Sequence, residues 1–137
     1  MKSSLNINQL SSKRSFNING YLFEYEKPLV MGILNMTPDS FYDGGKYNSI
    51  DSAISRIEGM INNGASIIDI GGCSTRPGSD IITIEEEWKR VGGIIKECSI
   101  RFKDTLFSVD TFRSEIARRS LEEGIHIIND VSGGSLD

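Results

Sequence analysis

Several polar side chains that could bind a ligand stand at the ends of apolar runs. Asn35 ends PLVMGILN, where its side-chain carbonyl could meet a cation and its amide an anion. Asp110 ends TLFSVD, and a carboxylate there could accept hydrogen bonds from a ring N–H and an exocyclic amine of a guanidine-like heterocycle. Asn129, near the end of IHIIND, both donates and accepts, which suits the amide edge of such a ring, and Val131 could pack on its face.

Two polar loops could add groups for a charged ligand. The loop NMTPDSFYDGG begins at Asn35 and exceeds the roughly two to six residues of an ordinary strand-to-helix connection. Its glycines would let it move like a lid. The loop GGCSTRPGS, residues 71–79, offers two hydroxyls, and Arg76 offers a planar guanidinium for an oxyanion. The fingerprint G-x-G-x-x-G is absent from the sequence, so nucleotide binding of the Rossmann type is unsupported.

Each of these features also has a purely structural interpretation. Both loops could be ordinary connections built from turn residues. Asp110 could cap a helix or bond to a neighbouring strand, and Asn129 could be a turn residue. The residues alone leave these alternatives open. His126, the single histidine, and Trp88 are expected to be packing or surface residues rather than catalysts.

The elements expected to position these side chains alternate between strand and helix. Apolar runs predict buried strands at residues 29–34, 65–72, 105–110 and 125–130. Helical spacing predicts helices at residues 49–64, 83–98 and 111–124, with Thr83 and Thr111 as N-caps and Gly124 as a C-cap. This order is typical of an α/β fold with parallel strands, either a doubly wound sheet or a (β/α) barrel. In both, the polar side chains converge at the carboxyl ends of the strands.

The chain divides into two unequal parts. Residues 1–27 are expected to form a leader and an N-terminal hairpin, because Asn19-Gly20 separates two short alternating runs in FNINGYLFEY. Residues 28–137 form the alternating unit. The chain has 137 residues, with 38% hydrophobic and 25% charged residues, as in an ordinary globular domain.

Charge and cysteine content narrow the classes of partner. A net charge of -4 without a basic patch argues against nucleic acid, and no apolar run approaches a membrane span or a signal peptide. The 2 cysteines, Cys73 and Cys98, lack metal-ligand spacing and predict free thiols in a reducing cytoplasm.

Three long motifs identify a family. MGILNMTPDSFYDGG, GASIIDIGGCSTRPGS and SVDTFRSEIARRSLEEGIHIINDVSGG resemble, in order and spacing, the N-terminal half of dihydropteroate synthase, over about residues 28–134. The resemblance implies a (β/α)8 TIM barrel, present here as an N-terminal half with about four parallel strands. It also implies a transferase that condenses 6-hydroxymethyl-7,8-dihydropterin diphosphate with 4-aminobenzoate, giving 7,8-dihydropteroate and diphosphate in folate biosynthesis.

The same resemblance assigns roles to single residues. Asn35 is similar to the asparagine that holds Mg²⁺ near the diphosphate, and Asp110 and Asn129 to the pair that binds the pterin, with Val131 as an apolar contact. Asp39, Arg76 and Asp110 match catalytic positions. The substrate-binding positions in the two loops are matched by Thr37, Pro38, Ser40, Ser74, Thr75 and Pro77. Cys73 departs from the family pattern, in which a glutamate or another polar residue is common.

The length of the chain qualifies these expectations. A (β/α)8 barrel needs roughly 250 residues, and the sequence predicts only half of its strands. We therefore expect a partial chain that is inactive alone, from a protein that is a homodimer when full length. Two alternatives remain: a non-catalytic pterin-binding module, or a pterin-dependent methyltransferase domain, which would not need the two polar loops.

Overall fold

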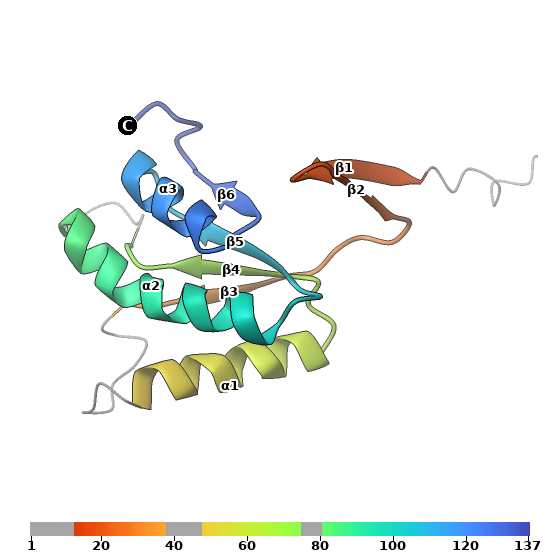
Figure 1. Ribbon diagram of the computed structural model, residues 1–137, viewed down its shortest axis with the longest axis horizontal. Helices are drawn as coiled ribbons and strands as arrows, with labels where there is room; N and C mark the ends of the chain where they lie inside the picture. Colours follow the sequence, from red (N-terminus) through yellow and green to blue (C-terminus); the bar gives the residue numbers. More distant parts are fainter. Residues whose placement is uncertain (1–12, 38–47, 75–80) are drawn as a thin grey trace, which may run out of the picture.

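The alternating unit folds into a parallel sheet of four strands. In the computed structural model, which describes residues 13–37, 48–74 and 81–137, the sheet has the order β3-β4-β5-β6 (Figure 1). The strands are β3 (Met31–Asn35), β4 (Ile67–Gly71), β5 (Leu106–Asp110) and β6 (Ile127–Asn129). Neighbouring strands follow one another in sequence, and a helix connects each strand to the next. The predicted strand–helix alternation is confirmed.

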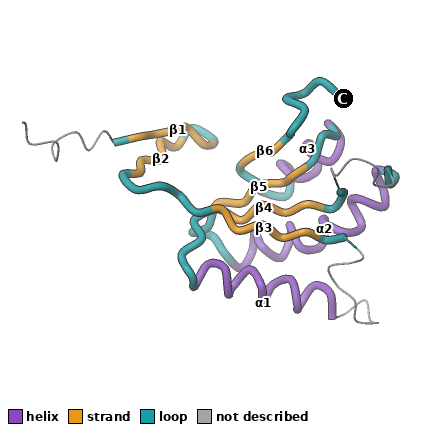
Figure 2. Tube along the Cα trace, turned by 180° about the vertical axis from the view of Figure 1, so that it is seen from behind, coloured by secondary structure: helices purple, strands orange, loops and turns teal. Residues whose placement is uncertain are grey.

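Three helices connect these strands and cover one face of the sheet (Figures 1 and 2). They are α1 (Asn48–Asn62), α2 (Ile84–Arg101) and α3 (Ser114–Glu122). Each places an apolar stripe against the alternate residues of the strands that point outward. The core between helices and sheet consists chiefly of Leu34, Ile54, Ile57, Ile68, Ile70, Val91, Ile94, Ile95, Phe107, Val109 and Ile116. No helix of the described segments is both long and apolar enough to cross a membrane.

The opposite, inner face of the sheet is layered from apolar to polar. Strand register places Met31, Ile67 and Leu106 in one row at the amino end. The next row on this face contains Ile33, Asp69, Ser108 and Ile127. The last row, at the carboxyl end, contains Asn35, Gly71, Asp110 and Asn129. Since successive rows are separated by two residues, each lies roughly 7 Å above the one before.

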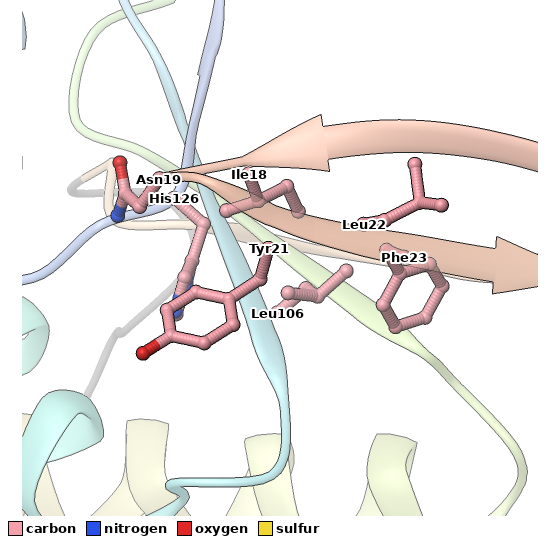
Figure 3. A pocket seen from close by; sticks show the side chains of 7 residues that line it. All are labelled: Ile18, Asn19, Tyr21, Leu22, Phe23, Leu106 and His126. Atoms are coloured by element: carbon pink, nitrogen blue, oxygen red, sulfur yellow. The ribbon is translucent and has the colours of Figure 1, made fainter.

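An antiparallel hairpin precedes the sheet and lies at its amino end. Strands β1 (Arg14–Ile18) and β2 (Tyr21–Tyr25) pair across a two-residue turn, as predicted. Asn19 and Gly20 both have positive φ, 50° and 87°, which a tight turn of this type requires. A hollow of about 280 Å³ separates the hairpin from the start of β5, and it is lined by Ile18, Asn19, Tyr21, Leu22, Phe23, Leu106 and His126 (Figure 3).

The structure corrects several local predictions. The first strand was expected to be buried on both faces, but Ile33 on its inner face is 59% exposed. Thr111 does not cap the third helix, which begins at Ser114 with Arg113 at the N-cap position, because the Thr111 hydroxyl is bonded to Glu87 and to the Arg113 N–H. Helix α2 continues three residues beyond Cys98 to Arg101.

Candidate functional site

The row of residues at the carboxyl end of the sheet forms the upper surface of the candidate site. Asn35, Gly71, Asp110 and Asn129 occupy the same register on β3, β4, β5 and β6. A Cβ atom at Gly71 would lie 3.3 Å from Asn35 Oδ1 and 3.5 Å from Asp110 Cβ. The absence of a side chain at Gly71 therefore leaves a gap between the side chains of Asn35 and Asp110, and the side-chain oxygens of both residues border this gap.

A second carboxylate, Asp69, lies one row below. Asp69 is 3% exposed, and its Oδ2 accepts a hydrogen bond of 3.0 Å from Asn129 Nδ2. Three buried oxygens here have no hydrogen-bond partner among the described residues: Asp69 Oδ1, Ser108 Oγ and Asp110 Oδ1. Buried polar groups are rarely left unsatisfied, so this cluster is suited to a ligand that donates hydrogen bonds.

The surroundings of Asp110 oppose its ionisation. Burial raises the pKa of its carboxyl group above the usual 3.8, and the negative charges of Asp69, Glu87 and Asp130 raise this pKa further. No cation among the described residues is hydrogen-bonded to Asp110. A ligand that donates N–H groups to Asp110 would therefore favour the ionised form and be bound more tightly for that reason.

A buried ionic network fixes the loops beside this site. Glu87, 1% exposed on α2, accepts hydrogen bonds from Arg113 Nη1 at 2.7 Å and from Thr111 Oγ1 at 2.8 Å. Arg113 Nη2 also donates to the carbonyl oxygen of Ile82. Arg90, on the same helix as Glu87, donates to the carbonyl oxygen of Gly72 at 3.1 Å. These contacts fasten both flanks of the second polar loop and the segment after β5.

Asp130 holds the first part of the segment after β6 in place. Asp130 accepts hydrogen bonds from the Ser132 N–H, the Ser132 hydroxyl and the Gly134 N–H. The bonds from Ser132 and Gly134 lower the pKa of Asp130. Val131 lies on this segment and is 71% exposed. Little of its side chain packs against the described chain, so the predicted contact with a ligand stays a prediction.

The structure brings together part of the predicted site. Asn35, Asp110 and Asn129 share one row, as the position of each at a strand end predicted. Thr37 and Ser74 lie at the borders of described segments. The remaining predicted loop residues lie outside the described residues: Pro38, Asp39, Ser40, Thr75, Arg76 and Pro77.

Sequence reasoning missed three residues that shape the site: Asp69, Glu87 and Arg113. Asp69 stands inside the apolar run ASIIDIGG, and a charge there is itself a signal that this position faces inward to a polar site. Glu87 and Arg113 lie 26 positions apart in sequence, and nothing local indicates that they pair.

The oxygens at the row are chemically suited to Mg²⁺. The described residues contain no cluster of three or more His, Cys, Asp or Glu that could enclose a metal ion. Mg²⁺ does not need one, since it often binds through one or two protein oxygens together with substrate phosphates and water. Asn35 Oδ1, which borders the gap above Gly71, is such an oxygen, so the residues present fit this ion.

Comparison with known proteins places the chain among pterin-binding proteins. Residues 31–137 match the family model of the pterin binding enzymes. The chain is 48% identical over 124 residues to the dihydropteroate synthase of Clostridium beijerinckii, covering 90% of this chain and 44% of that protein.

Solved structures that resemble this chain are also dihydropteroate synthases. The chain is similar to the dihydropteroate synthase of Xanthomonas albilineans with 4-aminobenzoic acid, with 37% identity, a TM-score of 0.80, and coverage of 89% of this chain and 45% of that one. It is also similar to the Burkholderia cenocepacia dihydropteroate synthase complexed with 7,8-dihydropteroate, with 35% identity, a TM-score of 0.74, and coverage of 88% and 39%. The chain thus spans less than half the length of these relatives and matches part of their barrel.

Proposed function

Because the chain belongs to the pterin-binding enzyme family and is homologous to the dihydropteroate synthases, we propose that it supplies the N-terminal half of a dihydropteroate synthase site. The protein would join 6-hydroxymethyl-7,8-dihydropterin diphosphate to 4-aminobenzoate and release diphosphate. The observation that carries this proposal is the in-register row of Asn35, Gly71, Asp110 and Asn129 above the buried Asp69.

The pterin ring is the part of the substrate that this row would bind. A pterin presents a guanidine-like edge with a ring N–H and an exocyclic amine, both hydrogen-bond donors. Asp110 Oδ1 is a buried acceptor without a protein partner in the described chain, and Asn129 Oδ1 is available because Nδ2 donates to Asp69. Hydrogen bonds to a charged acceptor contribute about 1.5–3 kcal/mol each, enough to select this edge.

The diphosphate would lie above the row, toward the two polar loops. Asn35 would hold Mg²⁺ there, and the bound ion would supply positive charge to the departing diphosphate. Arg76 would add a guanidinium, and Asp39, Thr37, Pro38, Ser40, Ser74, Thr75 and Pro77 would enclose the substrates. Most of these loop residues lie outside the described segments. Their assignments are therefore supported by the family relationship alone.

The residues present support a reaction without a covalent protein intermediate. Loss of diphosphate leaves a developing positive charge on the pterin, which the negative carboxylate of Asp110 would stabilise. The amine of 4-aminobenzoate would then attack the exposed carbon, and its nitrogen would release one proton to the departing diphosphate or to water. Enclosure by the loops would keep water from competing with the amine.

Turnover would require more of the barrel than this chain contains. Met31 and Ile33 on the inner face of β3 are exposed, which fits coverage by further strands. Relatives are more than twice as long as the matched segment. We propose that the complete protein has this barrel and, like the full-length family, acts as a homodimer.

The test is an assay of the complete product of the reading frame that encodes this sequence. We expect dihydropteroate to form from both substrates with Mg²⁺, and Asp110→Asn to weaken binding of the pterin substrate by on the order of a hundredfold. Unchanged pterin binding by this variant would contradict the role of Asp110. Pterin binding without product, in the complete protein, would instead support a non-catalytic pterin-binding module.

A further inference from the structure

Asp69 has no assigned task in the proposed reaction, yet it is the most deeply buried carboxylate of the inner face. It is 3% exposed in the middle of β4, in register with Ile33 on one side and the fully buried Ser108 on the other. A carboxylate is expensive to bury without compensation. Its one hydrogen bond among the described residues, from Asn129 Nδ2 at 3.0 Å, spans 60 positions in sequence and joins β4 to β6.

This hydrogen bond determines which atom of Asn129 is available to a ligand. An ionised carboxylate can only accept, so the amide nitrogen of Asn129 must face Asp69. The amide oxygen of Asn129 then remains for the space above the row. With Asp110 on the adjacent strand, the site presents acceptors on two neighbouring strands, at positions paired in register.

We propose that Asp69 is a positioning residue that orients the Asn129 amide and thereby makes the site select ligands with a donor at this edge. The inference rests on the proposed function, since it concerns how the same site would distinguish a pterin from related rings. Asp69 lies one row, or roughly 7 Å, below Asn129 and Gly71 along the strands, and the bond from Asn129 Nδ2 to its Oδ2 is the contact through which it would act on the ligand.

The predicted consequence is a change in ligand preference when Asp69 loses its charge. Asp69→Asn keeps the size of the side chain but adds an amide that can donate. Asn129 could then turn its amide over, accept from the new residue and present its own N–H₂ group to the ligand. A ring with a donor at this edge would lose a hydrogen bond, and a ring with an acceptor there would gain one.

The experiment compares two ligands by calorimetry on the complete protein. One is 6-hydroxymethyl-7,8-dihydropterin, and the other is its analogue in which a carbonyl oxygen replaces the 2-amino group. We expect the unmodified protein to prefer the amino ligand, and Asp69→Asn to reduce this preference by on the order of tenfold, the equivalent of one hydrogen bond. The same substitution in an Asn129→Ala background should leave the remaining preference unchanged, because Asp69 then has nothing to orient.

A matched control separates orientation from damage to the fold. Ile57→Val, in the fully buried core between α1 and the sheet, should lower the melting temperature without changing the preference between the ligands. Equal weakening of both ligands by Asp69→Asn, or an unchanged preference, would overturn the role of Asp69. Failure of the unmodified protein to bind either ligand would instead overturn the proposed function.

Discussion

The two ends of the same four strands have opposite chemistry. At the amino end, the inner face begins with Met31, Ile67 and Leu106, and the hairpin encloses an apolar hollow against Leu106 (Figure 3). At the carboxyl end, the face finishes with two asparagines, a glycine and an aspartate. We therefore expect the amino end to contribute stability and the carboxyl end to contribute recognition, as in barrels generally.

The single histidine illustrates this division. His126 lines the hollow at the amino end, where its Nδ1 accepts a hydrogen bond of 3.1 Å from the Phe107 N–H. Burial lowers the pKa of His126, which favours the neutral ring that can accept this bond. The expectation that His126 packs, rather than catalyses, agrees with this position. The histidine at this end has a structural task, whereas the partly buried Asp110 at the other end has a buried oxygen without a protein partner in the described chain.

The largest effect should come from the buried ion pair near the carboxyl end. Glu87→Ala would leave Arg113 buried and unpaired, and should lower the free energy of unfolding by about 3–5 kcal/mol. Glu97→Ala on the same helix breaks an exposed pair with Arg101 and should change it by less than about 1 kcal/mol. Urea unfolding followed by circular dichroism measures both, and equal losses would contradict the importance of burial.

A side chain at Gly71 should disrupt recognition more than folding. Gly71→Val would push Asn35 and Asp110 apart, and a displacement of about 1 Å can weaken a site by about a hundredfold. The counterpart at the amino end is Gly20→Val, whose φ of 87° would be strained, lowering stability by about 1–2 kcal/mol with pterin binding unchanged. Unaltered pterin affinity in Gly71→Val would show that the row is not the ligand surface.

The hairpin should affect stability alone. Phe23 packs on Phe16 with ring centroids 5.1 Å apart, so Phe23→Ala should lower the free energy of unfolding by about 1 kcal/mol. Tyr21→Ala, at a side chain that is 80% exposed, should have almost no effect. Thermal unfolding and pterin titration of both variants check this. A loss of pterin affinity in Phe23→Ala would contradict the separation of stability and recognition between the two ends.

The smallest expected effect is a pH dependence at the carboxyl end. Because the pKa of Asp110 is raised in the folded protein, the folded state binds this proton more tightly than the unfolded chain does. Stability should therefore fall as pH rises from 3.8 through the raised pKa, whereas pterin affinity should rise over the same range as Asp110 ionises. Asp110→Asn should remove both trends, and their persistence in that variant would assign them to another group.

The sequence predicted the fold well because its signals are local. Apolar runs, helical spacing and the Asn19-Gly20 turn each lie within a few residues, and the structure confirms the elements they indicate. It also predicted that Asn35, Asp110 and Asn129 converge, since each ends a parallel strand. Prediction failed where partners are distant in sequence. Thr111 resembled an N-cap, but its hydroxyl donates a hydrogen bond to Glu87 on α2 instead.

The same limit applies to the site. The bond from Asn129 to Asp69 could not be read from either local motif, because it depends on how four strands are aligned. The exposure of Ile33 could not be predicted either, since a run of apolar residues does not show which neighbours cover it.

The two arginine anchors have a consequence for how this protein can vary. Arg90 holds the carbonyl oxygen of Gly72, and Arg113 holds that of Ile82, so the chain is tied down on both sides of the second loop. Doubling the length of a flexible loop between fixed ends costs only about 0.6 kcal/mol. Insertions between the anchors should therefore be tolerated by the sheet, which would let natural or designed variants change the length of this loop without rebuilding the scaffold.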